Sequence, residues 1–133
     1  MIVGGTIFNQ KLSYEYCGGT WEKISLKSKT NVSKTIAISS RRKNQLQEDL
    51  IQELNFNSVY CGGSGNKIAK LLRGEVDVVM FLDCTTSTWD SCAGEAIIIG
   101  MKGIFTKPDN SKIEYKFEKM DQTNYEGFIC CLD

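Results

Sequence analysis

Apolar and polar positions along this chain follow two periods, one typical of strands and one typical of helices. Short apolar runs, which predict strands, occupy residues 2–8, 13–17, 20–24, 35–39, 57–61, 76–81, 103–106 and 127–132. Apolar residues recur at helical spacing over residues 44–54, 68–72 and 89–101, and these segments predict helices. We expect Pro108–Asn110 to form a turn and residues 112–115 to be the hairpin partner of the strand before it, with loops over residues 27–34 and 83–88.

The alternation of strands and helices from residue 35 onward predicts an α/β layered sandwich. We expect one domain over residues 1–133, with a central, mostly parallel mixed sheet flanked by helices. A chain of this length can bury a core of its own. Residues 127–132 are apolar throughout, and we expect this strand to be an adhesive edge that favours self-association if nothing covers it.

Composition removes several classes of partner. Charge is balanced, with 16 basic and 16 acidic residues, so no net field favours nucleic acid or a membrane. No apolar run could span a bilayer and no leader precedes the first strand, so we expect a cytoplasmic protein. The six cysteines include no C-x-x-C pair and histidine is absent, so we interpret the cysteines as small apolar residues in a reducing compartment rather than zinc ligands.

A glycine-rich stretch, Gly62-Gly63-Ser64-Gly65, lies between a predicted strand and a predicted helix, with Lys67 in the first turn of that helix. Free backbone N–H groups at a helix N-terminus form a cradle for an anion, and a lysine adds a point charge. The spacing matches neither a P-loop nor the dinucleotide fingerprint. A plain strand-to-helix turn explains the pattern equally well.

Hydroxyl and basic side chains follow the predicted strand 35–39. They are Ser39, Ser40, Arg41, Arg42 and Lys43. Ligands of open α/β sheets gather outside the carboxyl ends of strands, and two hydroxyls with three cations suit a phosphate. Taken singly, a solvated basic helix start is the better interpretation. Cations at a helix N-terminus oppose the helix dipole, however, and a nearby anion would relieve that arrangement.

Asp90 follows Trp89 in the first turn of the predicted helix 89–101. A carboxylate there is favoured by the free N–H groups and the dipole, so Asp90 is either a helix cap or a ligand for a hard cation. For an isolated aspartate the cap is the commoner case. All three stretches stand at strand-to-helix junctions, where separate loops converge on one ligand, and together they favour a binding site more than any one does.

Two of these motifs carry a resemblance to a known family. The turn Gly62–Lys67 and the later segment Trp89–Ala93 together resemble the lithium-sensitive, Mg²⁺-dependent phosphatases, which include inositol monophosphatases, 3'(2'),5'-bisphosphate nucleotidases and inositol polyphosphate 1-phosphatases. The resemblance covers almost the whole chain and corresponds to the C-terminal half of the family's fold. It implies a metal-dependent phosphoric monoester hydrolase that acts on a small phosphorylated substrate, with Mg²⁺ as cofactor.

The resemblance also implies roles for particular residues. Asp90 occupies the place of a metal ligand. The positions implied to contact substrate are Ser40, Arg42, Lys43, Gly63, Ser64 and Lys67. Lys67 favours a substrate with a second phosphate, such as adenosine 3',5'-bisphosphate. The run Gly63-Ser64-Gly65-Asn66-Lys67 resembles the bisphosphate nucleotidases. Thr85-Thr86 together with Trp89–Ala93 resembles the inositol polyphosphate 1-phosphatases equally well, so both substrate classes stay open.

One part of the family pattern has no counterpart in this sequence. The family's Asp-Pro-x-Asp-Gly-Thr motif, with its metal-binding acids, is absent, and the only proline is Pro108. We therefore expect a substrate-binding half that is inactive by itself and that works with the N-terminal half of the same fold. The rival hypothesis is a non-catalytic module that binds anions or another protein.

Overall fold

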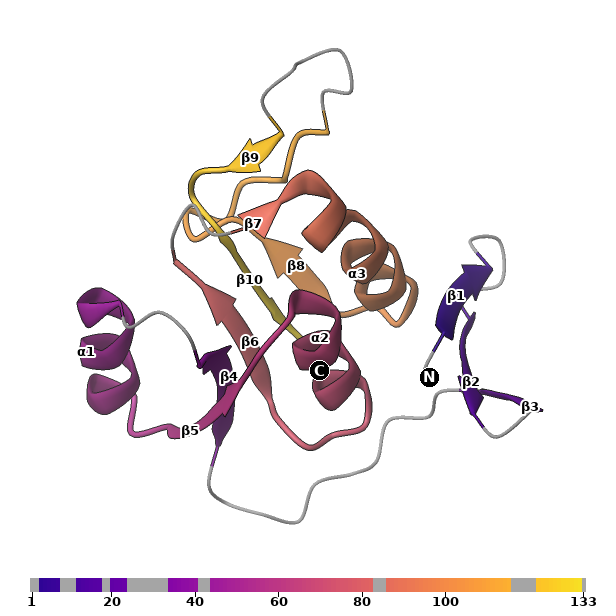
Figure 1. Ribbon diagram of the computed structural model, residues 1–133, viewed down its shortest axis with the longest axis horizontal. Helices are drawn as coiled ribbons and strands as arrows, with labels where there is room; N and C mark the ends of the chain where they lie inside the picture. The colour runs from indigo at the N-terminus through magenta and orange to yellow at the C-terminus, as the bar shows by residue number, and fades with distance from the viewer. Residues whose placement is uncertain are drawn as a thin grey trace.

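A five-stranded mixed sheet forms the centre of the molecule (Figure 1). The computed structural model describes residues 3–7, 12–17, 20–23, 34–40, 44–82, 86–115 and 122–132. Across the sheet the strands are β5 (Asn57–Cys61), β4 (Thr35–Ser39), β6 (Val78–Phe81), β10 (Phe128–Cys131) and β8 (Ile104–Thr106). The strand β4 runs parallel to β5 and β6, whereas β10 runs antiparallel to β6 and β8. The expected mixed sheet is confirmed, although parallel pairings do not outnumber antiparallel ones.

Helices cover both faces of this sheet. The helices α2 (Ser64–Leu72) and α3 (Thr88–Gly100) pack on one face, and α1 (Gln45–Glu53) packs on the other. Successive side chains of a strand point to opposite faces. Ala37, Val79 and Phe81 therefore join the core under α2 and α3. Their neighbours Ile36, Ile38 and Met80 join Ile51 in the core under α1.

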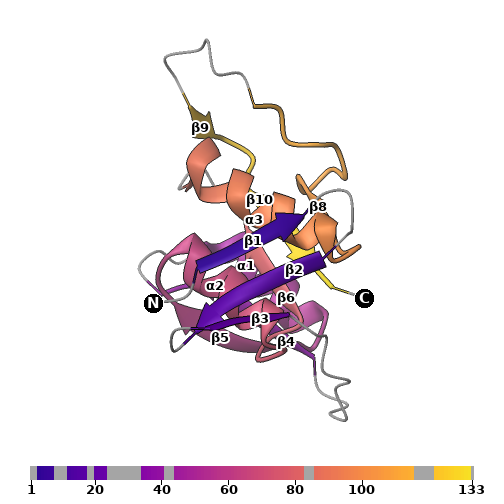
Figure 2. The same ribbon diagram turned by 90° about the vertical axis from the view of Figure 1, so that its right-hand side faces the viewer.

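A second, antiparallel sheet makes a further layer beside α3. It consists of β1 (Val3–Ile7), β2 (Leu12–Cys17) and β3 (Thr20–Lys23), close to the three strands that the sequence predicted at the start of the chain. Both β1 and β2 contact α3, so this helix lies between the two sheets (Figure 2). The layered α/β sandwich is thereby confirmed.

The helix boundaries follow from local chemistry. The Asn44 side chain accepts a hydrogen bond from the backbone N–H of Gln47 at 3.3 Å and so caps α1. After α2 the chain turns at Gly74, whose φ of 69° lies in the left-handed region that favours glycine, and the predicted end of this helix is confirmed. None of the helices in the described residues combines the length and the apolar character needed to cross a membrane.

The predicted hairpin partner of β8 is wrong. Residues 111–115 form no strand, and β8 pairs instead with β10. Ile113 is buried in the core, and the Tyr115 hydroxyl hydrogen-bonds to Glu95 and, at 3.3 Å, to Ser91 on α3. Burial and the bond to Glu95 raise the pKa of the Tyr115 hydroxyl well above its ordinary value. Residues 111–115 therefore contact α3 and do not pair with β8.

Two further expectations need correction. The apolar run 127–132 is not an edge, because β10 lies between β6 and β8 and both of its sides are paired. The expected loop 83–88 contains a short strand, β7 (Thr86–Ser87), which pairs with β9 (Thr123–Asn124). The predicted loop 27–34 lies, except for Lys34, outside the described residues, as do positions 83–85.

Candidate functional site

The residues that directly follow β4 and β5 lie side by side. The parallel register places Ser39 of β4 opposite Cys61 of β5, so Ser40 and Gly62 follow at the same edge of the sheet. A methyl group added to Gly62 would lie 4.0 Å from the Ser40 Oγ. The structure therefore brings Ser40, which is exposed, beside the glycine-rich turn. Two other predicted site residues, Arg42 and Lys43, lie outside the described residues.

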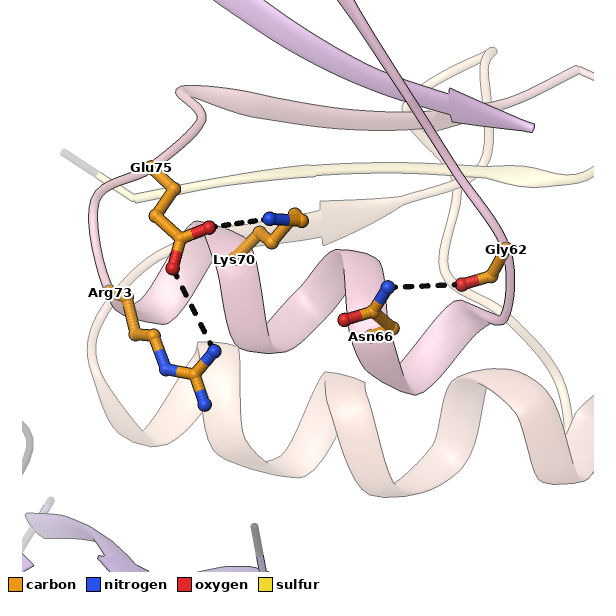
Figure 3. A network of polar contacts seen from close by, with 5 residues as sticks. All are labelled: Gly62, Asn66, Lys70, Arg73 and Glu75. Carbon is orange, nitrogen blue, oxygen red and sulfur yellow. Dashed lines mark hydrogen bonds and ion pairs between the residues drawn. The ribbon is translucent and has the colours of Figure 1, made fainter. Parts of the chain in front are cut away.

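The glycine-rich turn opens α2 in a conformation that requires glycine. Gly63 is the N-cap of α2 and has a φ of 73°. A residue with a side chain would be strained in this backbone conformation. The Asn66 side chain reaches back and donates to the Gly62 carbonyl at 3.3 Å, which fixes the turn (Figure 3). None of the described side chains caps α2, so the first backbone N–H groups of this helix can bind an anion. At the far end of the helix, Lys70 and Arg73 pair with Glu75 (Figure 3).

A second helix N-terminus meets the first through Asp90. The backbone N–H of Ser87 donates to Asp90 Oδ2 at 2.9 Å, which makes Asp90 the acid of a capping box at the start of α3. The other oxygen, Oδ1, accepts a hydrogen bond from the Ser64 hydroxyl at 3.3 Å. This bond joins the first turn of α2 to the first turn of α3. Asp90 is thus a cap, and it also faces the glycine-rich turn.

The close approach of these two helices depends on a glycine. A methyl group on Gly94 of α3 would lie 2.2 Å from Ile68 Cδ1 of α2, far inside van der Waals contact. Ile68 is itself buried, so it has little room to move. The absence of a side chain at position 94 therefore lets α2 and α3 pack closely and keeps their N-termini together.

Lys67 lies beneath the meeting point of the two helices, not on its surface. Only 1% of the residue is exposed, and its Nζ lies 4.5 Å from the centroid of the Phe81 ring on β6. An ammonium at this distance from an aromatic face is attracted by the ring quadrupole. The sequence placed Lys67 near the glycine-rich turn, but its side chain points into the core. Its contact with a substrate stays a prediction.

The start of α2 suits an anion, and a sequence comparison supports the same chemistry. The sequence profile of the inositol monophosphatase family matches residues 3–128. This chain belongs to the inositol monophosphatase family. The resemblance inferred from the glycine-rich turn and the Trp-Asp motif is confirmed.

Curated relatives of this family member carry one name. The chain is 31% identical over 98 residues to 3'(2'),5'-bisphosphate nucleotidase 1 of Mus musculus, a match that covers 73% of this chain and 32% of the relative. The same protein of Homo sapiens is 30% identical with the same coverage. The chain therefore spans about a third of the length of these relatives.

Solved structures of inositol monophosphatase type share the fold. A Pyrococcus horikoshii protein described as similar to inositol-1 monophosphatase has a TM-score of 0.64 at 20% identity, over 92% of this chain and 48% of that one. Staphylococcal IMPase-II with 2'-AMP bound has a TM-score of 0.59 at 11% identity, over 90% of this chain and 47% of that one. At these identities the likeness establishes the fold alone.

The Mg²⁺ site implied for this family is not complete within the described residues. Each Asp90 oxygen accepts a hydrogen bond, one from Ser64 and one from Ser87. Nowhere in the described part of the chain do three Cys, His, Asp or Glu side chains gather where they could hold a metal ion. Because Mg²⁺ seeks near-octahedral oxygen coordination, these residues do not fit it by themselves. The ligand role of Asp90 stays a prediction.

Sequence reasoning missed the elements that hold the start of α3. The pattern Ser87-x-x-Asp90 is a capping-box signature and could have identified Ser87 from the sequence. The pairing of β7 with β9 could not be found in this way, because both strands are only two residues long and are far apart in the sequence.

Proposed function

We propose that this chain is the substrate-binding half of a phosphatase that releases phosphate from a small phosphorylated molecule. The observation that carries the proposal is the meeting of two helix N-termini, joined by the hydrogen bond from Ser64 to Asp90. Helix N-termini bind phosphate through free N–H groups and the positive end of the dipole. Membership of the inositol monophosphatase family supports the same chemistry.

We place 3'(2'),5'-bisphosphate nucleotides first among the candidate substrates, with removal of the 3'-phosphate from adenosine 3',5'-bisphosphate. The names of the curated relatives support this choice. Inositol polyphosphates are the alternative, with an activity of the 1-phosphatase type. Staphylococcal IMPase-II has been solved both with 2'-AMP and with inositol monophosphate bound, so one protein of this fold binds a nucleoside monophosphate and an inositol monophosphate.

We propose that the exposed face of this site binds the phosphate directly. Ser40 would supply a hydroxyl donor, Gly63 and Ser64 would supply backbone donors, and Arg42 and Lys43 would add charge. Lys67 differs because its ammonium is buried against Phe81. We propose that it contacts the second phosphate only if that group enters between α2 and β6.

The metal chemistry of the proposal needs more than this chain's described residues provide. Mg²⁺ would polarise the phosphate ester and activate a water molecule. One carboxylate does not supply the coordination that Mg²⁺ requires. We therefore propose that Asp90 supplies one ligand and that the N-terminal half of the same fold supplies the others.

The first prediction concerns activity. We expect this chain by itself to release no phosphate from adenosine 3',5'-bisphosphate or inositol 1,4-bisphosphate in the presence of Mg²⁺, because Asp90 stands without the family's other acids. A colorimetric assay of released phosphate measures this. Turnover by the chain alone that Asp90→Asn abolishes would show instead that its own residues complete the site.

The second prediction concerns binding. We expect Ser64→Ala to weaken the affinity for adenosine 3',5'-bisphosphate about tenfold or more, since a hydrogen bond to a charged group is worth about 1.5–3 kcal/mol. Isothermal titration calorimetry measures the affinity. Thr35→Val is the matched control, because it removes a hydroxyl that is bonded to Asp77 at 2.9 Å, at the opposite end of β4.

The same titrations separate the candidate functions. Tighter binding of inositol 1,4-bisphosphate than of the nucleotide would assign the alternative substrate class. Binding of either ligand that Lys67→Met leaves unchanged would remove Lys67 from the set of substrate contacts. Failure of the wild-type chain to bind either phosphate would favour the rival hypothesis of a module for another partner.

A further inference from the structure

The start of α3 is held in place by a segment that lies more than thirty residues further along the chain. Thr86 and Ser87 of β7 pair with Asn124 and Thr123 of β9 in an antiparallel ladder. The ladder ends where the helix begins, because Thr88 is the first residue of α3. In Figure 1, β7 and β9 lie together at the top of the molecule, at one end of α3.

Gln122, which precedes β9, contacts the first residue of α3 directly. Its backbone carbonyl accepts from the Thr88 N–H at 2.9 Å, and its side-chain Oε1 accepts from the Thr88 hydroxyl at 2.8 Å. One residue therefore binds both the main chain and the side chain of Thr88. The carbonyl satisfies the first N–H of α3 whichever residue stands at 122, whereas the bond to the Thr88 hydroxyl depends on the Gln122 side chain.

These contacts lead directly to Asp90. Ser87 precedes Thr88 and donates its N–H to Asp90 Oδ2 at 2.9 Å. The Thr88 carbonyl in turn accepts from the Ser91 hydroxyl at 3.0 Å. A displacement of Thr88 would therefore move the donor that fixes one oxygen of Asp90, and with it the oxygen that faces Ser64.

The ladder also contains two buried polar side-chain atoms. Thr86 Oγ1 and Asn124 Nδ2 have no hydrogen-bond partner among the described residues, although the two residues stand opposite each other in the ladder. A buried polar group without a partner is costly, and apolar side chains of similar shape would avoid that cost.

We propose that Gln122 is a positioning residue, which acts through Thr88 to fix the direction of the Asp90 carboxylate at the phosphate site. The inference rests on the proposed function for the role of Asp90. It assigns to Gln122 no direct contact with substrate or metal. Residues 122–124 thereby help to fix the geometry of the site through the start of α3.

The experiment compares Thr88→Val with Thr88→Ser in the full chain. Valine keeps the shape of the threonine side chain but removes the hydroxyl that donates a hydrogen bond to Gln122 Oε1, whereas serine retains that hydroxyl. We expect Thr88→Val to speed amide hydrogen exchange at Ser87 and Thr88 about five- to tenfold, the factor that one lost hydrogen bond corresponds to. We expect Thr88→Ser to restore slow exchange.

Binding of inorganic phosphate is the second measurement, followed by the fluorescence of Trp89 in a Trp21→Phe background. Trp89 is two-thirds exposed and adjoins Asp90, so it reports on the site. We expect Thr88→Val to weaken phosphate binding about fivefold and Thr88→Ser to leave it near the wild-type value. Thr35→Val is again the control, because it also removes a threonine hydrogen bond but lies away from α3.

The outcomes are separable. Phosphate affinity and exchange at Ser87 that change no more in Thr88→Val than in Thr35→Val would overturn the proposal. A wild-type chain that binds no phosphate would contradict the proposed function. In that case the exchange rates and the Trp89 spectrum still decide whether Gln122 holds the first turn of α3.

Discussion

Replacing Phe128 with alanine is expected to lower the free energy of unfolding by about 3–5 kcal/mol. Phe128 is fully buried in the middle of the sheet, and its ring centroid lies 4.7 Å from those of Phe81 and Phe105 on the neighbouring strands β6 and β8. Truncation would leave a cavity that three strands border. Because small domains are stable by only about 5–15 kcal/mol, the loss should be visible as a large shift of the urea midpoint.

The neighbouring residue provides the control for Phe128. Ile129 follows it in β10 but points to the other face, where it is only partly buried beside the core under α1. We expect Ile129→Ala to cost less than half as much as Phe128→Ala, since part of its surface already meets water. Equal losses for the two variants would contradict the division of the sheet into two cores of different depth.

Replacing Gly94 with alanine is expected to destabilise the fold by about 1–3 kcal/mol and to weaken ligand binding at the same time. The added methyl group would lie 2.2 Å from Ile68 Cδ1 and 3.6 Å from the Phe105 ring. The helices α2 and α3 must separate to accommodate it, which lengthens the hydrogen bond between Ser64 and Asp90. Urea denaturation and titration with phosphate measure the two effects.

Two further variants test the cause of the Gly94 effect. Gly65→Ala adds the same methyl group in α2 at a place where, outside its own helix backbone, no atom of the described residues lies within 4 Å, and it should be neutral or stabilise the protein by about 0.4–1 kcal/mol. Ile68→Val removes the Cδ1 atom with which the new methyl collides. Combined with Gly94→Ala, it should therefore recover part of the lost stability and affinity. A double variant no better than Gly94→Ala would show that helix contact is not the cause.

Most elements could be predicted because their patterns are strong over short distances. The bounds of β4 and β5 coincide with the predicted strands, since each run ends at a change from apolar to polar residues. The helix α3 begins one residue before Trp89 because Ser87 and Asp90 form a capping box there. The partner of β8 could not be predicted, because a turn at Pro108–Asn110 is compatible with a hairpin whether or not the chain after it pairs.

The location of the candidate site could be predicted from the sequence, but the direction of its side chains could not. Strand-to-helix junctions converge in this class of fold, and the hydrogen bond from Ser64 to Asp90 joins two junctions that the sequence singled out. The direction of the Lys67 side chain was not predictable, since a lysine in a first helical turn is usually solvated. Its burial against Phe81 depends on the helix orientation over β6, which only tertiary packing determines.

The central position of β10 has a consequence for the order in which the chain acquires its structure during synthesis. The strand β8 leaves the ribosome before β10, yet among the described strands it pairs only with β10. Until residues 128–131 emerge, β8 lacks this partner and the edge of β6 that β10 covers stays unpaired. The sheet therefore closes late, through contacts between distant parts of the chain, and such long-range pairings form slowly. During that interval the nascent chain would expose apolar surface that a chaperone can bind.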